Sequence, residues 1–122
     1  MRERISESEL AVMDVVWSNA PITANAVADA LVAYRDWSLQ TVKTLLARLV
    51  VKGALSTEQD GRRFLYRPLI AREDYRAREG RRFVDRLFEG RVSPLVAQLA
   101  EQEALSDSDI AELKMIIDRL GQ

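Results

Sequence analysis

The sequence of 122 residues contains no cysteine and no histidine. Without cysteine there can be no disulfide bond, thiolate zinc site or thiol catalysis, and without histidine the most common metal ligand and general base is missing. No apolar run approaches the ~20 residues that a membrane-spanning helix needs. The opening residues, MRERISESEL, show no hydrophobic segment typical of a signal peptide. We therefore expect a cytoplasmic protein that is not inserted in a membrane.

Catalysis by such a chain would require a pair of carboxylates, a lysine or a bound metal ion. None of these occurs at a recognisable spacing. The acidic residues near the C-terminus also lack the D-x-D-x-D-G pattern of a calcium loop. We expect no enzymatic activity, no catalytic residue, no metal site and no cofactor.

Charge is separated along the chain although the formal net charge is only −1. Residues 37–70 carry six basic and two acidic side chains, a net charge of +4, whereas residues 93–122 carry two basic and six acidic ones, a net charge of −4. The first segment is suited to an anionic partner and the second is not.

Two helices are predicted in the first third of the chain. Ser6 and Glu9 have the S-x-x-E spacing of a capping box, and apolar residues then recur at helical intervals. Pro21 ends this helix. Thr23 is a suitable N-cap for a second helix that extends to about Ala33.

A third helix is predicted after Ser38, its N-cap, and Gly53 lies where a helix often ends in a left-handed residue. Its apolar positions are spaced to form one buried stripe: Val42, Leu45, Leu46 and Leu49. The opposite face carries short polar and basic side chains and no acidic one: Gln40, Thr41, Lys43, Thr44, Ala47 and Arg48.

The pattern then changes to that of a β-hairpin. Residues 54–59 and 62–67 are predicted as antiparallel strands around Asp60-Gly61, a dipeptide that favours a type I′ turn, and Pro68 ends the second strand. Three helices followed by a hairpin are the order of a winged helix-turn-helix. We expect the aromatic residues nearby, such as Phe64, to pack in the core or along the strands.

After Pro68 the pattern is helical again, with Ser93 and Pro94 suited to the N-cap and first position of one helix and Ser106 to the N-cap of another. About 50 residues in short helices form a small core, so their apolar faces require either the winged helix or a second copy of the chain. Two-fold dimers are the most common oligomers. The expected dimerisation residues are Phe83, Leu87, Leu95, Leu99, Ile110, Leu113, Ile117 and Leu120.

The predicted fold is therefore mainly α with a small β-hairpin. Residues 1–70 would form a winged-helix DNA-binding domain and residues 71–122 a helical dimerisation domain. In a helix-turn-helix the second helix of the pair enters the DNA major groove, where Thr, Gln, Lys and Arg contact bases and phosphates. The expected DNA-binding residues are Gln40, Thr41, Lys43, Thr44 and Arg48 on the third helix, with Arg62 and Arg63 beside the hairpin turn.

Two other interpretations of these residues remain open. A Lys-Thr-Arg face is often only the solvated side of a helix. A winged helix can also use its third helix or its hairpin to bind a protein, which would make the chain an interaction module without sequence-specific DNA binding.

Three segments carry a resemblance to a known family: ELAVMDVVWSNAPITANAVADAL, WSLQTVKTLLARLVVKGAL and FLYRPLI. Together with the tail segment FVDRLFEGRVSPLVAQLAEQEALSDSDIAELKMIIDRL, they resemble the BlaI/MecI family of penicillinase and methicillin-resistance repressors over nearly the whole chain. The resemblance implies a winged-helix domain, a helical dimerisation domain, and repression by a homodimer at an inverted-repeat operator, here of β-lactamase or related stress-response genes. It places major-groove contacts on Thr41, Lys43, Thr44 and Arg48. Position 40 is often lysine in the family, so Gln40 is expected to weaken one phosphate contact or alter base preference.

Members of this family that respond to penicillin are inactivated by proteolysis in the dimerisation domain, triggered by a membrane sensor protease or a protease downstream of it. The matching segment is around Gln98-Leu99, which differs from the Asn-Phe pair that those members carry. A related copper-responsive branch binds metal through C-terminal cysteines, and this chain has none.

Overall fold

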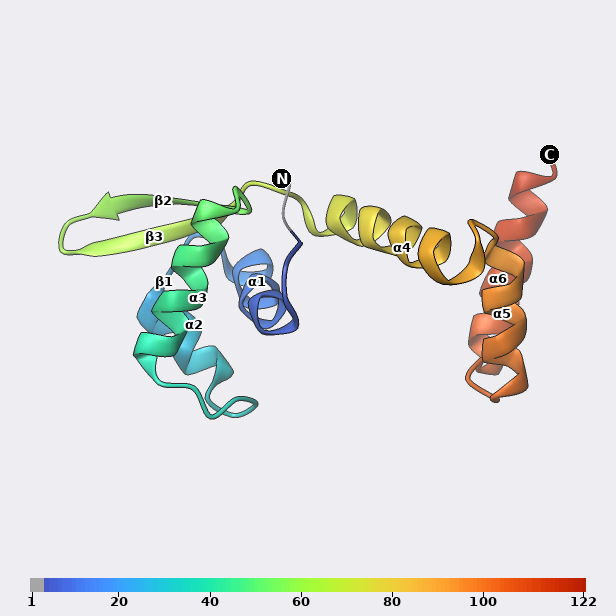
Figure 1. Ribbon diagram of the computed structural model, residues 1–122, viewed down its shortest axis with the longest axis horizontal. Coiled ribbons are helices and arrows are strands. Elements are labelled where there is room, and N and C mark those ends of the chain that lie inside the picture. The colour runs from blue at the N-terminus through green and yellow to red at the C-terminus, as the bar shows by residue number, and fades with distance from the viewer. Residues whose placement is uncertain (1–3) are drawn as a thin grey trace. The chain divides into compact units, whose positions relative to one another are not determined.

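A computed structural model describes residues 4–122, and the chain divides into two compact units, Met1–Tyr75 and Arg76–Gln122 (Figure 1). The first unit contains α1 (Glu7–Asn19), β1 (Ile22–Thr23), α2 (Ala24–Leu31), α3 (Leu39–Val51), β2 (Leu55–Asp60), β3 (Arg63–Pro68) and the first turn of α4 (Arg72–Phe88). The second contains the rest of α4, α5 (Val92–Glu101) and α6 (Asp107–Leu120). The predicted fold class, mainly α with a small β-hairpin, is confirmed.

The predicted N-caps of the first three helices are present. In α1 the Ser6 hydroxyl accepts a hydrogen bond from the Glu9 N–H, while Glu9 Oε1 accepts one of 2.8 Å from the Ser6 N–H. Thr23 and Ser38 each accept a hydrogen bond from the N–H three residues ahead, at the starts of α2 and α3. Each cap satisfies a donor that the helix itself leaves unpaired, so the boundaries follow from local sequence.

Helices α1, α2 and α3 surround the core of the first unit. The predicted stripe of α3 is buried in that core: Val42, Leu45, Leu46 and Leu49. Fully burying such a side chain contributes about 1.5–3 kcal/mol to stability. This packing determines how α3 is rotated about its axis, and therefore which of its side chains remain at the surface.

An ion pair inside the first unit joins the start of α1 to the end of α3. The Glu9 side chain, 2% exposed, accepts a hydrogen bond of 2.6 Å from Lys52 Nζ, and Lys52 is the C-cap residue of α3. Lys52 Nζ also donates to the Arg4 carbonyl oxygen at 2.8 Å. Because removing one member of a buried pair leaves an uncompensated charge, this contact strongly favours one relative position of α1 and α3.

The pKa of Glu9 lies below its ordinary value. Burial acts to raise the pKa, but the hydrogen bonds from Lys52 and Ser6 and the positive charge of Lys52 lower it by more. A carboxyl whose pKa is lowered on folding stabilises the protein above its unfolded-state pKa, about 4.3 for glutamate. That contribution is lost as the pH falls through the lowered pKa of the folded state.

The hairpin differs from the prediction by one residue. Strands β2 and β3 pair Asp60 with Arg63, so the turn consists of Gly61 and Arg62 and not of Asp60 and Gly61. Gly61 has φ +67°, whereas Arg62 is not among the residues with positive φ, which fits a type II′ turn better than the predicted type I′. Glycine at the first central position satisfies this turn without strain, and Asp60 becomes part of the strand.

The sheet also contains a third strand that was not predicted. The two residues of β1 pair with Tyr66 and Leu65 of β3, giving the strand order β1-β3-β2. Strand β1 is too short to show an alternating pattern. The prediction that Phe64 is packed was wrong, because this side chain is 49% exposed near the tip of the hairpin, which extends past the helices of this unit (Figure 1).

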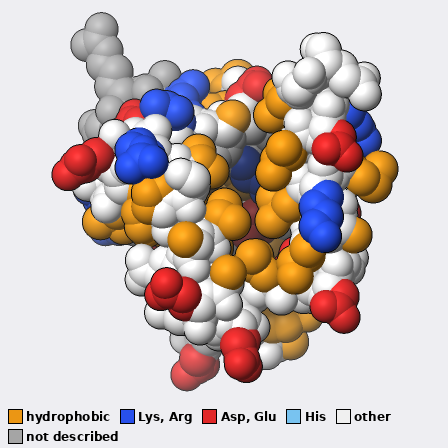
Figure 2. All heavy atoms as spheres, turned by 90° about the vertical axis from the view of Figure 1, so that its right-hand side faces the viewer, with side chains coloured by type: hydrophobic (Ala, Val, Ile, Leu, Met, Phe, Trp, Pro, Cys, Tyr) orange, Lys and Arg blue, Asp and Glu red, His pale blue; other side chains and the backbone are white. Residues whose placement is uncertain are grey.

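The second unit has almost no buried interior of its own. Among its residues only Val84 is buried, and neither α5 nor α6 buries any side chain. Figure 2 faces α5 and α6 and shows hydrophobic side chains at their surface between charged ones. The predicted cap of α6 is present as a capping box of Ser106 and Asp109. These helices therefore form from local sequence but leave their apolar faces uncovered within one chain.

The predicted start of α5 was wrong. The N-cap is Arg91, which makes no side-chain capping hydrogen bond, and the helix begins at Val92. Ser93 and Pro94 thus lie inside the first turn. Proline is tolerated there because the first four N–H groups of a helix have no partner within the helix.

Replacing Lys52 with methionine tests the buried ion pair. We expect Lys52→Met to lower the free energy of unfolding by about 2–4 kcal/mol at pH 7, because the Glu9 carboxylate loses its partner. The difference from the unaltered protein should shrink as the pH falls below about 4. Urea denaturation at both pH values measures this.

The matched control is Arg67→Met, which breaks an exposed ion pair of 3.1 Å with Glu58. Exposed pairs contribute about 0–1 kcal/mol, so this variant should change stability little at either pH. Equal effects of the two substitutions would contradict the role given to the buried pair.

Candidate nucleic-acid interface

The outer face of α3 is exposed along its whole length. All the side chains predicted for this face lie at the surface: Gln40, Thr41, Lys43, Thr44, Ala47 and Arg48. No acidic residue occurs between Leu39 and Lys52. The helix thus presents two cations and several short side chains with no carboxylate among them.

The two threonine hydroxyls of this face already have partners. Thr44 Oγ1 donates to the Gln40 carbonyl oxygen at 3.0 Å, and Thr41 Oγ1 lies 3.1 Å from the Ser38 hydroxyl at the N-cap. Back-bonding to the helix fixes a threonine side chain and leaves its methyl group available. Thr44 is consequently suited to an apolar contact, of the kind made with the methyl group of thymine.

A shallow groove runs along α3 and includes two residues that the sequence did not single out for binding. Its lining consists of Gln40, Lys43, Thr44, Ala47, Arg48, Val51 and Lys52. Val51 is among the most exposed apolar side chains of the first unit. Val51 adds an apolar side chain to a groove that is otherwise lined by polar and basic residues and Ala47.

The two arginines of the hairpin have different environments. Arg62 lies in the turn itself, exposed and without an ion pair among the described residues. Arg63 begins β3, and its guanidinium donates to Asp60 Oδ2 from Nε at 3.2 Å and from Nη2 at 3.1 Å. Part of the charge of Arg63 is therefore compensated, and Arg62 is the stronger candidate for a phosphate contact.

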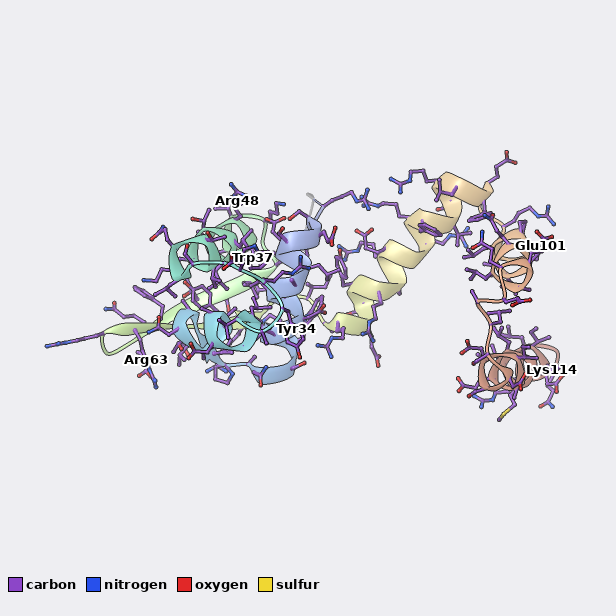
Figure 3. All side chains as sticks on the ribbon, turned by 90° about the horizontal axis from the view of Figure 1, so that it is seen from below. Tyr34, Trp37, Arg48, Arg63, Glu101 and Lys114 are labelled. Atoms are coloured by element: carbon purple, nitrogen blue, oxygen red, sulfur yellow. The ribbon has the colours of Figure 1, made fainter. Side chains whose placement is uncertain are left out.

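Lys43 lies between the outer face of α3 and the hairpin. It lines the groove along α3 and also a second concavity against the sheet. The other residues that line this second concavity are Thr23, Ala24, Asn25, Arg62, Arg63, Phe64 and Tyr66. In Figure 3 Arg48 and Arg63 project on different sides of the unit, so these two arginines do not converge on one point. The concavity contains three cations and the first turn of α2, where the helix dipole favours an anion.

Five residues of this concavity were not predicted to bind: Thr23, Ala24, Asn25, Phe64 and Tyr66. Thr23 was recognised only as a cap, and Asn25 follows it in the first turn of α2. The helix-turn-helix order could have indicated the start of α2, because the first helix of the pair crosses the DNA backbone. The helix-turn-helix order could not have indicated Phe64, because the exposure of this side chain depends on the register of the hairpin.

The predicted dimerisation residues lie on the second unit with their apolar surface largely uncovered. Phe83 and Leu87 of α4 are 41% and 55% exposed, and Ile117 and Leu120 of α6 are 64% and 80% exposed. Leu99 and Ile110 are also exposed, while Leu95 and Leu113 are half-buried. Ile116, which was not predicted, extends the same stripe on α6 and is exposed too.

Other kinds of site find no support in the part of the chain that the structure describes. Residues 4–122 contain no cluster of three or more metal-ligating side chains. None of their helices combines the length and the apolar character required to cross a membrane.

Comparisons with known proteins agree with these features. The family model described as penicillinase repressor matches residues 5–119. The penicillinase repressor of Bacillus licheniformis is 36% identical over 115 residues, which cover 94% of this chain and 90% of the relative.

Two solved structures are also similar. The solution structure of the DNA-binding domain of the repressor BlaI has a TM-score of 0.55 and 42% identity, covering 62% of this chain and 94% of that one. The monomeric form of BlaI from Bacillus licheniformis in complex with the blaP half-operator has a TM-score of 0.53 and 41% identity, covering 62% and 92%.

Proposed function

The chain belongs to the penicillinase repressor family, and from this premise we propose that it represses transcription as a homodimer bound to an inverted-repeat operator. That it is a DNA-binding transcriptional repressor rests on relatives named as repressors and on the similarity to BlaI bound to a half-operator. The dimer, the symmetry of the operator and the residues that contact it are the finer parts of the proposal.

The observation that supports DNA binding most directly is the outer face of α3. Packing of the opposite face leaves Lys43, Thr44 and Arg48 exposed on a helix segment without acidic residues. Arg and Lys pair with guanine or phosphate, and Thr contacts the thymine methyl group, so this face fits a major groove. The concavity beside Lys43 suits a backbone phosphate that flanks the groove.

The exposed apolar side chains of the second unit support the proposal that the chain forms a dimer. It carries exposed leucine, isoleucine and phenylalanine side chains on α4 and α6 and has only one buried residue. Apolar surface of this kind is stabilised when a second copy covers it. A dimer would hold two α3 helices for successive major grooves about 34–36 Å apart, and the second half-site would be bound at high effective concentration.

Relief of repression by proteolysis is proposed for α5. In one chain Gln98 and Leu99 are exposed on a helix that buries no side chain. In the proposed dimer the second copy would cover Leu99, so a cut there requires α5 to open first and removes a contact between the copies. A sensor protease in the membrane or a protease downstream of it would perform the cut and so release the dimer from DNA. The regulated genes would be those of β-lactamase or of a related stress response.

Selection of bound fragments from genomic DNA tests the proposed function. We expect the bound fragments to share an inverted repeat whose half-sites are centred about one helical turn, or a multiple of it, apart. Such repeats should lie near promoters. Fragments that share no sequence, or binding that heparin abolishes equally for every fragment, would favour a protein-interaction module.

Substitutions on α3 and the hairpin should separate base contacts from phosphate contacts. We expect Thr44→Ala to relax base preference at one position of the operator, because it removes the methyl group that would contact thymine, at a cost of about 0.8 kcal/mol. Lys43→Ala and Arg62→Ala should instead weaken binding to all sequences and reduce the salt dependence by about one unit of slope per lost contact. Fluorescence anisotropy with operator and scrambled duplexes measures both effects.

The control for these substitutions is Arg67→Ala, an exposed charge on β3 that is paired with Glu58. It should leave affinity and salt slope nearly unchanged. If replacing Lys43, Arg48 and Arg62 together left operator binding intact, another surface would have to contact the DNA.

A charge on α6 should separate the two subunits. We expect Ile117→Asp to convert the dimer to monomers, because a carboxylate cannot be buried in an apolar interface without a partner. Sedimentation equilibrium at micromolar concentration measures this. Arg119→Asp, a change on the side of α6 opposite Ile117, is the control and should leave the dimer intact. A stable dimer of the Ile117 variant would place the interface elsewhere.

A further inference from the structure

We propose that the arginine stripe of α4, defined as Arg78, Arg82 and Arg86, is a second DNA-contacting surface that binds backbone phosphates without regard to sequence. The inference rests on the proposed function, since it assumes that the first unit binds duplex DNA. The basic side of α4 belongs neither to the α3 face nor to the apolar dimerisation surface, so it has no other proposed role.

The three arginines form one line along the helix. They are four residues apart, so each lies one turn, about 6 Å, beyond the last and on nearly the same side. All three are exposed, and together with Arg81 and Asp85 they line a shallow depression on the helix surface. The stripe therefore presents a row of guanidinium groups over about 12 Å.

The stripe has little compensation from carboxylates. Asp85, three residues after Arg82, is already paired with Arg81 at 3.0 Å. Among the described residues, none of the three stripe arginines makes a salt bridge. Like charges four residues apart destabilise a helix by about 0.2–0.5 kcal/mol per pair, so this arrangement is unfavourable unless an anion binds to it.

The orientation of α4 leaves the stripe free in a dimer. At 3.6 residues per turn, Val84 and Leu87 lie on the side of the helix opposite the centre of the stripe, and Phe83 lies between that side and Arg86. If a second copy covers that apolar side, as proposed, the arginines face away from the covered surface. The stripe then stays exposed in the dimer and is available to an anionic partner.

Duplex DNA is the partner that the chain itself suggests. The first turn of α4 is held on the winged-helix unit, where Arg72 Nη2 donates to the Asp14 carbonyl oxygen at 3.0 Å and to Ser18 Oγ at 2.9 Å. Tyr75 packs against Trp17, with ring centroids 5.6 Å apart. The stripe begins three residues after Tyr75, and its planar guanidinium groups suit phosphate oxygens better than lysine would.

The test compares two charge-matched double variants of the full-length chain. In Arg82→Gln/Arg86→Gln the stripe loses two of its charges. In the control, Lys114→Gln/Arg119→Gln, the chain loses the two basic residues of α6, which are exposed and lie outside the stripe. Affinity is measured between low and moderate salt for a selected operator and for a scrambled duplex of the same length, and sedimentation verifies that both variants remain dimers.

We expect the stripe variant to bind both duplexes more weakly, with a salt slope that is smaller by about two units per protomer than that of the unaltered chain. The control should keep the original slope. If the unaltered chain binds the operator and the two variants have equal slopes, the stripe does not contact DNA and an acidic protein becomes its better partner. If the unaltered chain binds no duplex selectively, the proposed function fails, and this inference fails with it.

Discussion

Helix α3 buries Val42, Leu46 and Leu49 in the core of the first unit, and this burial determines which of its side chains are left for a partner. A helix with one fully buried stripe cannot rotate without moving apolar groups into water. The Glu9–Lys52 ion pair adds a second restraint, because it joins the C-cap residue of α3 to the first turn of α1. The basic, acid-free face of α3 is thus a consequence of packing as well as of composition.

The two units differ in how far they bury their apolar side chains within one chain. The first surrounds a continuous core, so its shape is specified within one chain. The second has capped helices whose apolar faces remain uncovered, with Val84 its only buried residue among those described. Stability of the second unit would then depend on a second copy, and any event that opens α5 would reduce the contact between the copies. In the proposed repressor, DNA affinity would therefore depend on whether α5 is intact, although α5 is not proposed to contact DNA.

Features set by neighbouring residues could be predicted from the sequence. The caps at Ser6, Ser38 and Ser106 and the buried stripe of α3 follow from local spacing, and each is present. The hairpin turn was misplaced by one residue, because glycine permits either turn and pairing along β3 decides between them.

The start of α5 and the exposure of Phe64 were missed for a related reason. Arg91 begins α5 without a side-chain cap, so the sequence carries no signal there. The surroundings of Phe64 depend on how far the hairpin extends beyond the helices. The exposure of the α3 face could be predicted, whereas the concavity around Lys43 could not, because it joins residues from α2, α3 and the hairpin. The roles of these residues in binding remain predictions.

If one dimer binds two α3 helices to the same face of a duplex, its affinity must depend on the spacing of the operator half-sites. Affinity would be compared for the selected operator, for the same operator with about 5 bp inserted between its half-sites, and for a single half-site. Half a helical turn places the second half-site on the opposite face of the DNA. We expect the insertion to lower the affinity to that of the single half-site. Equal affinity for the intact and the expanded operator would show that the two α3 helices do not bind the same face together.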